Sequence, residues 1–105
     1  MALKKQYLKS KPVCKVTFRI PKKAAPYADQ VHLVGDFNGW NTRSLPMQRL
    51  KSGAFKLVVD LATGRDYAFR YLIDQKIWEN DWEADSYIPS PFEGVNNSVV
   101  SLLSK

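Results

Sequence analysis

Alternation of apolar and polar positions is the strongest pattern in this chain. Between Cys14 and Ile20 every second residue is apolar, and the residues between them are polar. Apolar residues also occupy every second position over residues 55–61 and 67–73. A period of two places successive side chains on opposite faces of an extended chain. The pattern therefore predicts three strands that each turn one face toward a hydrophobic core.

Shorter apolar runs complete the predicted secondary structure. Strands are expected at residues 31–34 and 98–103, and a short one at residues 77–79. The connection Ala62-Thr63-Gly64 predicts a hairpin between the strands on either side, because glycine readily takes a positive φ. No segment keeps the 3.6-residue spacing of an amphipathic helix. The chain is therefore predicted to be all-β, an immunoglobulin-like antiparallel sandwich of six to eight strands.

The length of 105 residues suits one domain. We expect residues 1–12 to form a basic arm and residues 13–105 to form the sandwich. No apolar run approaches the roughly 20 residues of a membrane helix. The first residues also lack the apolar stretch of a signal peptide. The expected location is the cytoplasm, with no membrane partner.

The charge is unevenly distributed along the chain. Residues 1–28 contain eight basic and no acidic residues, whereas residues 29–105 contain eight basic and ten acidic residues. A basic segment of this kind can bind nucleic acid through counterion release. A lysine-rich end is more often a solubilising one, so nucleic acid is not the expected partner.

Candidate catalytic and metal-binding residues are few. His32 and Cys14 lie within predicted strands, where a structural role and an inert buried thiol are expected. Four carboxylates follow one another at every second position, a pattern that suits calcium or a glycosidase pair; they are Glu79, Asp81, Glu83 and Asp85. The run has no tight glycine turn, and a small sandwich offers little cleft. We expect no metal, no cofactor and no catalytic activity.

Three tryptophans lie outside the long alternating runs. Trp40 occurs in a turn-forming string, and Trp78 and Trp82 flank a polar stretch. One interpretation is that these rings cap an end of the sandwich. The other is that they stay accessible and form flat platforms for the apolar faces of a sugar ring, with amides and cations bonding its hydroxyl groups.

Three strings in the chain resemble the family-48 carbohydrate-binding modules. They are HLVGDFNGWN at residues 32–41, YAFRYLID at residues 67–74 and NNSVV at residues 96–100. This family includes the glycogen-binding domain of the AMP-activated protein kinase beta subunit. It also includes the N-terminal early-set domains of isoamylase and glycogen branching enzymes. The resemblance, over residues 13–103, implies a sandwich that binds glycogen, starch or other α-1,4-glucans without cleaving them.

The resemblance also implies roles for single residues. Trp40 corresponds to the first stacking tryptophan, and Arg70 stands where the kinase subunit has a lysine that bonds sugar hydroxyls. Asn96, with Asn97 beside it, corresponds to the asparagine that bonds hydroxyls before the last strand. Phe92 occupies the loop position of an apolar residue that projects into the glucan helix.

Either Trp78 or Trp82 could provide the second stacking platform. In the kinase subunit a tryptophan follows Asp-Gly-Gln, whereas this chain has Asp74-Gln75-Lys76-Ile77-Trp78, which lacks the glycine and has one more residue. A shift of one residue turns a side chain to the opposite face of a strand. The alternative function is a structural or protein-interaction module that accompanies a glycoside hydrolase family 13 enzyme, such as isoamylase or branching enzyme, without binding sugar itself.

Overall fold

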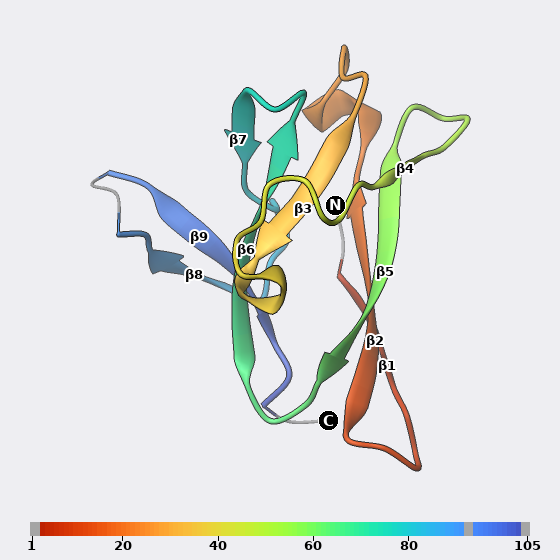
Figure 1. Cartoon of the computed structure of the whole chain (residues 1–105), viewed down its shortest axis with the longest axis vertical. Helices are drawn as coiled ribbons and strands as arrows, with labels where there is room; N and C mark the ends of the chain where they lie inside the picture. Colours follow the sequence, from red (N-terminus) through yellow and green to blue (C-terminus); the bar gives the residue numbers. More distant parts are fainter. Residues whose placement is uncertain (1–2, 92–93, 104–105) are drawn as a thin grey trace.

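The computed structural model of the chain describes residues 3–91 and 94–103. These residues form nine strands and two short 3-10 helices in two antiparallel layers (Figure 1). The elements in chain order are β1 (Lys4–Tyr7), β2 (Val13–Ile20), η1 (Lys22–Ala24), β3 (Val31–Gly35), η2 (Asp36–Asn38), β4 (Gln48–Arg49), β5 (Phe55–Ala62), β6 (Asp66–Ile73), β7 (Ile77–Glu79), β8 (Ser86–Pro89) and β9 (Asn96–Ser101). The predicted all-β sandwich is confirmed.

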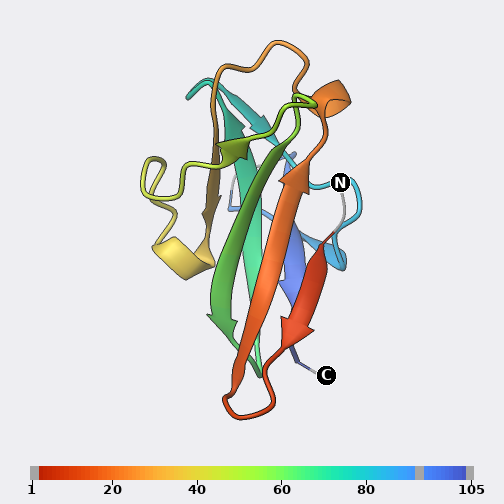
Figure 2. The same ribbon diagram turned by 90° about the vertical axis from the view of Figure 1, so that its right-hand side faces the viewer.

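The two layers are sheet A, in the order β1-β2-β5-β4, and sheet B, in the order β3-β6-β9-β8 with β7 also paired to β6. Figure 2 shows β1, β2 and β5 of sheet A in front of sheet B. The core lies between the layers. Cys14, Val16, Phe18 and Ile20 on β2 are fully buried in it, as the alternation predicts. Burial raises the pKa of the Cys14 thiol, which fits the expected inert role.

Aromatic rings join the two sheets across the core. The ring centroids of Phe18 in β2 and Phe69 in β6 are 5.1 Å apart, in an edge-to-face arrangement. The next inward ring of β6, Tyr71, lies 5.8 Å from Phe69. Edge-to-face pairs of this kind contribute beyond the area they bury. β6 is the strand of sheet B that pairs with β3, β7 and β9, and its inward rings connect it to the core.

The hairpin predicted at Ala62-Thr63-Gly64 is wrong. β5 pairs with β2 in sheet A, and β6 pairs with β3 and β9 in sheet B, so the connection arches from one sheet to the other (Figure 1). The backbone N–H groups of this connection bond to residues outside it. The Thr63 N–H donates to the Pro12 carbonyl, and the Gly64 N–H donates to the Leu102 carbonyl. The positive φ of Gly64, 88°, serves this arch.

Three strands were not predicted. β1 lies within the basic segment at the start of the chain and pairs with β2 at the edge of sheet A. The Lys5 ammonium also forms an ion pair with Asp85 at 2.7 Å. β4 has only two residues, and all four residues of β8 are exposed, so neither carries an alternating pattern. Among the described residues no helix is long and apolar enough to cross a membrane.

Candidate functional site

A groove of about 760 Å³ lies on the outer face of sheet B. The alternation of β6 creates this face: Phe69 and Tyr71 point into the core, and Ala68 and Arg70 point the opposite way. The turn after β3 forms one wall of the groove, and β8 with the residues after it forms the other. Trp40, Arg70, Trp78 and Asn97 line the groove together with Ile88 and Val95.

The turn that carries Trp40 depends on two glycines. A Cβ atom on Gly35 would lie 2.6 Å from the Ala68 carbonyl oxygen and 2.8 Å from the Phe69 Cβ, so only glycine lets the turn approach β6 this closely. Gly39 has a φ of 64°, and Trp40 follows with a φ of 58°. Two successive residues with positive, left-handed φ reverse the chain and direct it back along the sheet.

Asn38 holds this turn closed. Its side-chain oxygen accepts the Gly35 N–H at 3.1 Å, and its amide group donates to the Asn41 carbonyl at 3.0 Å and to the Ser44 hydroxyl at 2.9 Å. A single asparagine therefore joins both ends of the turn. These bonds explain why an asparagine suits position 38 of the string at residues 32–41.

The Trp40 indole is partly exposed and lines the groove. Its Nε1–H donates to Oδ1 of Asp36 at 2.8 Å, and Oδ2 of Asp36 accepts the Ala68 N–H at 2.8 Å. The ring is therefore anchored along its polar edge and retains an accessible apolar surface. The ring is not among the described side chains that pack against the hydrophobic core.

Arg70 lies in the floor of the groove, opposite Val34 of β3. Its Nε–H donates to Oδ1 of Asn97 at 2.7 Å. Its Nη2 atom is enclosed and makes no hydrogen bond within the described part of the chain. Burial lowers the pKa of the guanidinium, although an arginine keeps its charge at neutral pH.

The structure places Asn97 and Asn96 differently. Asn97 faces the outside of sheet B and lines the groove, whereas Asn96, one position earlier on β9, does not line it. Asn96 is exposed, and its backbone carbonyl accepts the side-chain amide of Asn80 at 2.9 Å. Phe92, the fourth kind of side chain expected in the site, lies outside the described residues.

Trp78 reaches the groove even though its turn lacks a glycine. β7 pairs with β6 so that Trp78 stands opposite Leu72, on the same face as Arg70. In the turn before it, Asp74 and Gln75 have φ values of 51° and 57°. These two residues therefore take the left-handed backbone conformation that a glycine would adopt more readily. The Trp78 ring is 43% exposed.

Trp82 is the tryptophan that does not join the groove. It is 49% exposed and lies within 5.8 Å of the Lys23 ammonium, measured to the ring centroid. Lys23 belongs to η1, which follows β2 of the other sheet. Of the two candidates for a second platform, the geometry brings Trp78, and not Trp82, together with Trp40.

His32 stabilises the rim of the groove. It is buried on β3, and its Nδ1 lies 3.2 Å from the side-chain nitrogen of Gln75. The same nitrogen donates to the Thr42 carbonyl at 2.8 Å, and Thr42 lines the groove. Burial, with the charge of Arg43, lowers the pKa of His32. The expected structural role of this histidine agrees with these contacts.

The alternating carboxylates anchor the chain. Asp81 is fully buried and accepts the Tyr71 hydroxyl at 2.7 Å. Burial, followed by the charge of Asp81, raises the pKa of Tyr71 well above its usual value. Asp85 accepts the Ser101 N–H at 2.8 Å. Across residues 3–91 and 94–103, no group of three or more potential ligands is placed to hold a metal ion.

Sequence reasoning missed part of the site. Asp36 was not singled out, although a carboxylate four residues before a tryptophan in a tight turn is a signal for a bond to the indole N–H. The apolar wall that Ile88 and Val95 form was also missed. It lies on β8 and in the loop after it, where no alternation marks the positions.

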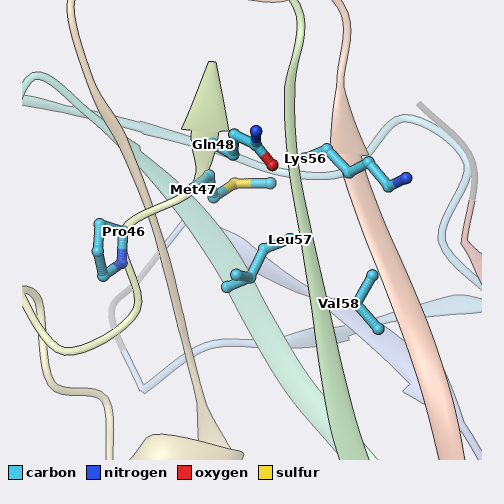
Figure 3. A pocket seen from close by; sticks show the side chains of 6 residues that line it. All are labelled: Pro46, Met47, Gln48, Lys56, Leu57 and Val58. Atoms are coloured by element: carbon cyan, nitrogen blue, oxygen red, sulfur yellow. The ribbon is translucent and has the colours of Figure 1, made fainter. Parts of the chain in front are cut away.

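A second hollow, of about 460 Å³, lies at the edge of sheet A (Figure 3). It opens where β4 ends and the edge of β5 continues without a neighbour. Figure 3 shows Met47 and Leu57 on one side of β5, and Lys56 and Val58 pointing away on the other side. None of the described residues that line the hollow is aromatic.

The sequence is similar to a known family and to curated enzymes. Residues 15–88 match the family described as carbohydrate-binding module 48 (isoamylase N-terminal domain). A 1,4-alpha-glucan branching enzyme from Photobacterium profundum is 46% identical over 46 residues, which are 43% of this chain and 6% of that enzyme. A 1,4-alpha-glucan branching enzyme from Butyrivibrio fibrisolvens is 33% identical over 63 residues, which are 60% of this chain and 10% of that enzyme. The chain therefore spans about a tenth or less of the length of these relatives.

Proposed function

Because the chain belongs to the carbohydrate-binding module 48 family, we propose that it binds α-1,4-linked glucan without cleaving it. The glucan lies in the groove on sheet B. The indoles of Trp40 and Trp78 stack on glucose units, while Arg70 and Asn97 donate to their hydroxyl groups. Glycogen, starch and maltooligosaccharides all present this repeating surface.

The observation that carries this proposal is the convergence of two tryptophans with a cation and an amide in one groove. Glucose has apolar C–H faces and a rim of hydroxyl groups, so it needs both kinds of contact. Three elements supply the four side chains: the turn after β3, the β6–β7 hairpin and β9. Pairing within sheet B holds these elements together. Because these elements are already held in place, little side-chain or loop entropy should be lost when the glucan binds.

The expected affinity is modest. If each stacked glucose unit hides roughly 100 Å² of apolar surface at about 25 cal/mol per Å², two platforms contribute about 5 kcal/mol. Each hydrogen bond adds roughly 0.5–1.5 kcal/mol, and the loss of translational and rotational freedom offsets a similar amount. The dissociation constant should lie between about 1 μM and 1 mM. That range suits a polymer with many repeated sites.

A titration of the whole chain with maltoheptaose and with β-cyclodextrin tests the proposal. We expect saturable heat and a change in tryptophan fluorescence. The matched control is cellohexaose, whose β-1,4 linkages make a straight chain of the same sugar; it should bind more weakly. No heat and no fluorescence change with millimolar maltoheptaose or β-cyclodextrin would reject glucan binding.

A second candidate function is packing against a glucan-active enzyme. The hollow at the edge of sheet A and the exposed side chain of Val58 favour it, because both leave apolar surface open away from the groove. The two functions separate experimentally. Retention on an α-glucan resin requires the groove, whereas association with a purified branching enzyme should survive the loss of Trp40.

A further inference from the structure

We propose that Asp36 is a positioning residue of the groove, whose carboxylate fixes the Trp40 indole in the orientation that a sugar ring needs. This inference rests on the proposed glucan binding at the same groove. Oδ1 of Asp36 accepts the indole N–H at 2.8 Å, and Oδ2 accepts the Ala68 N–H at 2.8 Å. One carboxylate therefore joins the platform directly to the central strand of sheet B.

The backbone of Trp40 shows why such an anchor is needed. A φ of 58° is uncommon for a bulky residue and marks a conformation that its surroundings must maintain. The Trp40 N–H donates to the Gly35 carbonyl at 2.9 Å, which holds the backbone but leaves the ring free to turn about its side-chain torsions. The bond from the indole to Asp36 removes that freedom.

A charged acceptor suits this task better than a neutral one. Hydrogen bonds to a carboxylate are shorter and stronger than those between neutral groups. Asp36 uses one oxygen for the indole in the turn and the other for Ala68 on β6, with no basic side chain paired to it in the described part of the chain. The carboxylate therefore acts on the ring through the N–H. Its effect on sugar binding should disappear when the platform has no N–H to hold.

A double-mutant cycle tests this consequence. Asp36→Ala should weaken β-cyclodextrin binding about tenfold, as expected for a hydrogen bond to a charged group. Trp40→Phe keeps an aromatic ring but removes the N–H. In the Trp40→Phe background, Asp36→Ala should change the affinity by less than about twofold, because the two positions are coupled. Asp60→Ala, at an exposed site on sheet A, is the matched control and should bind as the wild-type chain does.

An equal loss of affinity in both backgrounds would overturn the proposal, since Asp36 would then act through the fold or on the sugar itself. Unchanged affinity in Asp36→Ala would overturn it as well. If Asp36→Ala does not fold, Asp36→Asn replaces it. An amide of the same size offers one oxygen to two N–H groups, so one of the two bonds is lost. If the Trp40 indole signal shifts in Asp36→Asn, the affinity should fall. If only the Ala68 amide signal shifts, the affinity should stay unchanged, and a loss of affinity in that case would overturn the proposal.

A ligand-free measurement separates this inference from the proposed function. In the ¹H–¹⁵N spectrum, Asp36→Ala should shift the Trp40 indole signal and speed its hydrogen exchange, with the Trp78 and Trp82 indole signals unchanged. An unmoved Trp40 signal rejects the role of Asp36, whatever the affinity. If the wild-type chain binds no glucan, glucan binding fails, and this signal still decides whether Asp36 fixes the ring.

Discussion

The groove on sheet B and the hollow on sheet A resemble each other in composition but differ in how their side chains are held. Both have apolar walls beside a basic residue, Arg70 in the groove and Lys56 in the hollow. Arg70 is bonded to Asn97, and the Trp40 ring is bonded to Asp36. Lys56 is exposed and has no ion pair among the described residues, and the walls beside it are aliphatic.

The difference shows what a sugar site requires of a sandwich. Apolar surface and positive charge are present in both regions, so neither is sufficient. The groove adds flat rings and polar groups whose positions are fixed before a ligand arrives, and preorganisation of this kind reduces the entropy lost on binding. Three sets of substitutions and one change of pH test this contrast.

Trp40→Ala should have the largest effect. It removes one platform, worth about 2.5 kcal/mol of buried apolar surface, and should weaken maltoheptaose binding about seventyfold. Because the ring lies outside the core, thermal unfolding of the variant should resemble that of the wild-type chain. Calorimetric titration and a thermal melt measure the two. A variant that no longer folds would show that the ring serves the fold and not the groove.

Trp78→Ala and Trp82→Ala form a matched pair with the next largest effect. Both rings are similarly exposed, but only Trp78 lines the groove. The Trp78 variant should lose at least about tenfold in affinity, because it removes the second platform. The Trp82 variant should bind normally. Fluorescence titration with β-cyclodextrin checks both, and the reverse result would move the second platform to Trp82.

Arg70→Met and Lys56→Met remove a cation from each of the two regions. Loss of the Arg70 donor should weaken glucan binding about fivefold, within the usual contribution of hydrogen bonds. Lys56→Met should leave affinity unchanged. Titrations at low and high salt provide the control, since a sugar is uncharged and binding should not depend strongly on ionic strength. Equal effects of the two variants would remove the distinction between the regions.

Acid should have the smallest effect on the groove. The pKa of His32 is lowered from 6.5 by burial and by Arg43, so the folded protein takes up this proton less readily than the unfolded chain. The contribution of His32 to stability should therefore be constant above about pH 7 and fall as the pH drops below 6.5. Protonated Nδ1 no longer accepts Gln75, which holds Thr42 at the rim, so affinity should fall by less than about twofold.

Thermal melts and titrations between pH 5 and pH 8 measure this effect of acid. His32→Asn is the control variant, because its side chain does not titrate in this range. The slope of stability with pH should be smaller in this variant. A stability that rises on acidification would contradict the lowered pKa.

The long strands were predictable because burial affects one face of each. Residues 14–20 and 55–61 alternate as sheet A requires, with an inner face in the core. In β6 both Ala68 and Leu72 are buried although they face outward, because Asp36 and β7 cover that side. The failed hairpin has a similar origin. Local turn chemistry shows that the chain reverses, but the choice between one sheet and two depends on pairing with distant strands.

The site was predictable to the level of the groove and not to the level of each contact. Trp40 and Arg70 line one groove, as expected from the resemblance, together with Trp78, which the sequence left open against Trp82. The choice between Asn96 and Asn97 depends on the register of β9, and a difference of one residue reverses the face. The anchoring role of Asp36 depends on a bond within the turn, which apolar patterning does not reveal.

The most direct measurement is a ¹H–¹⁵N titration of the wild-type chain with maltoheptaose, assigned at the indoles and along both sheets. We expect progressive shifts at the Trp40 and Trp78 indoles and at Asn97, with no shift at Val58 or Lys56. Shifts confined to sheet A, or none at millimolar maltoheptaose, would contradict it.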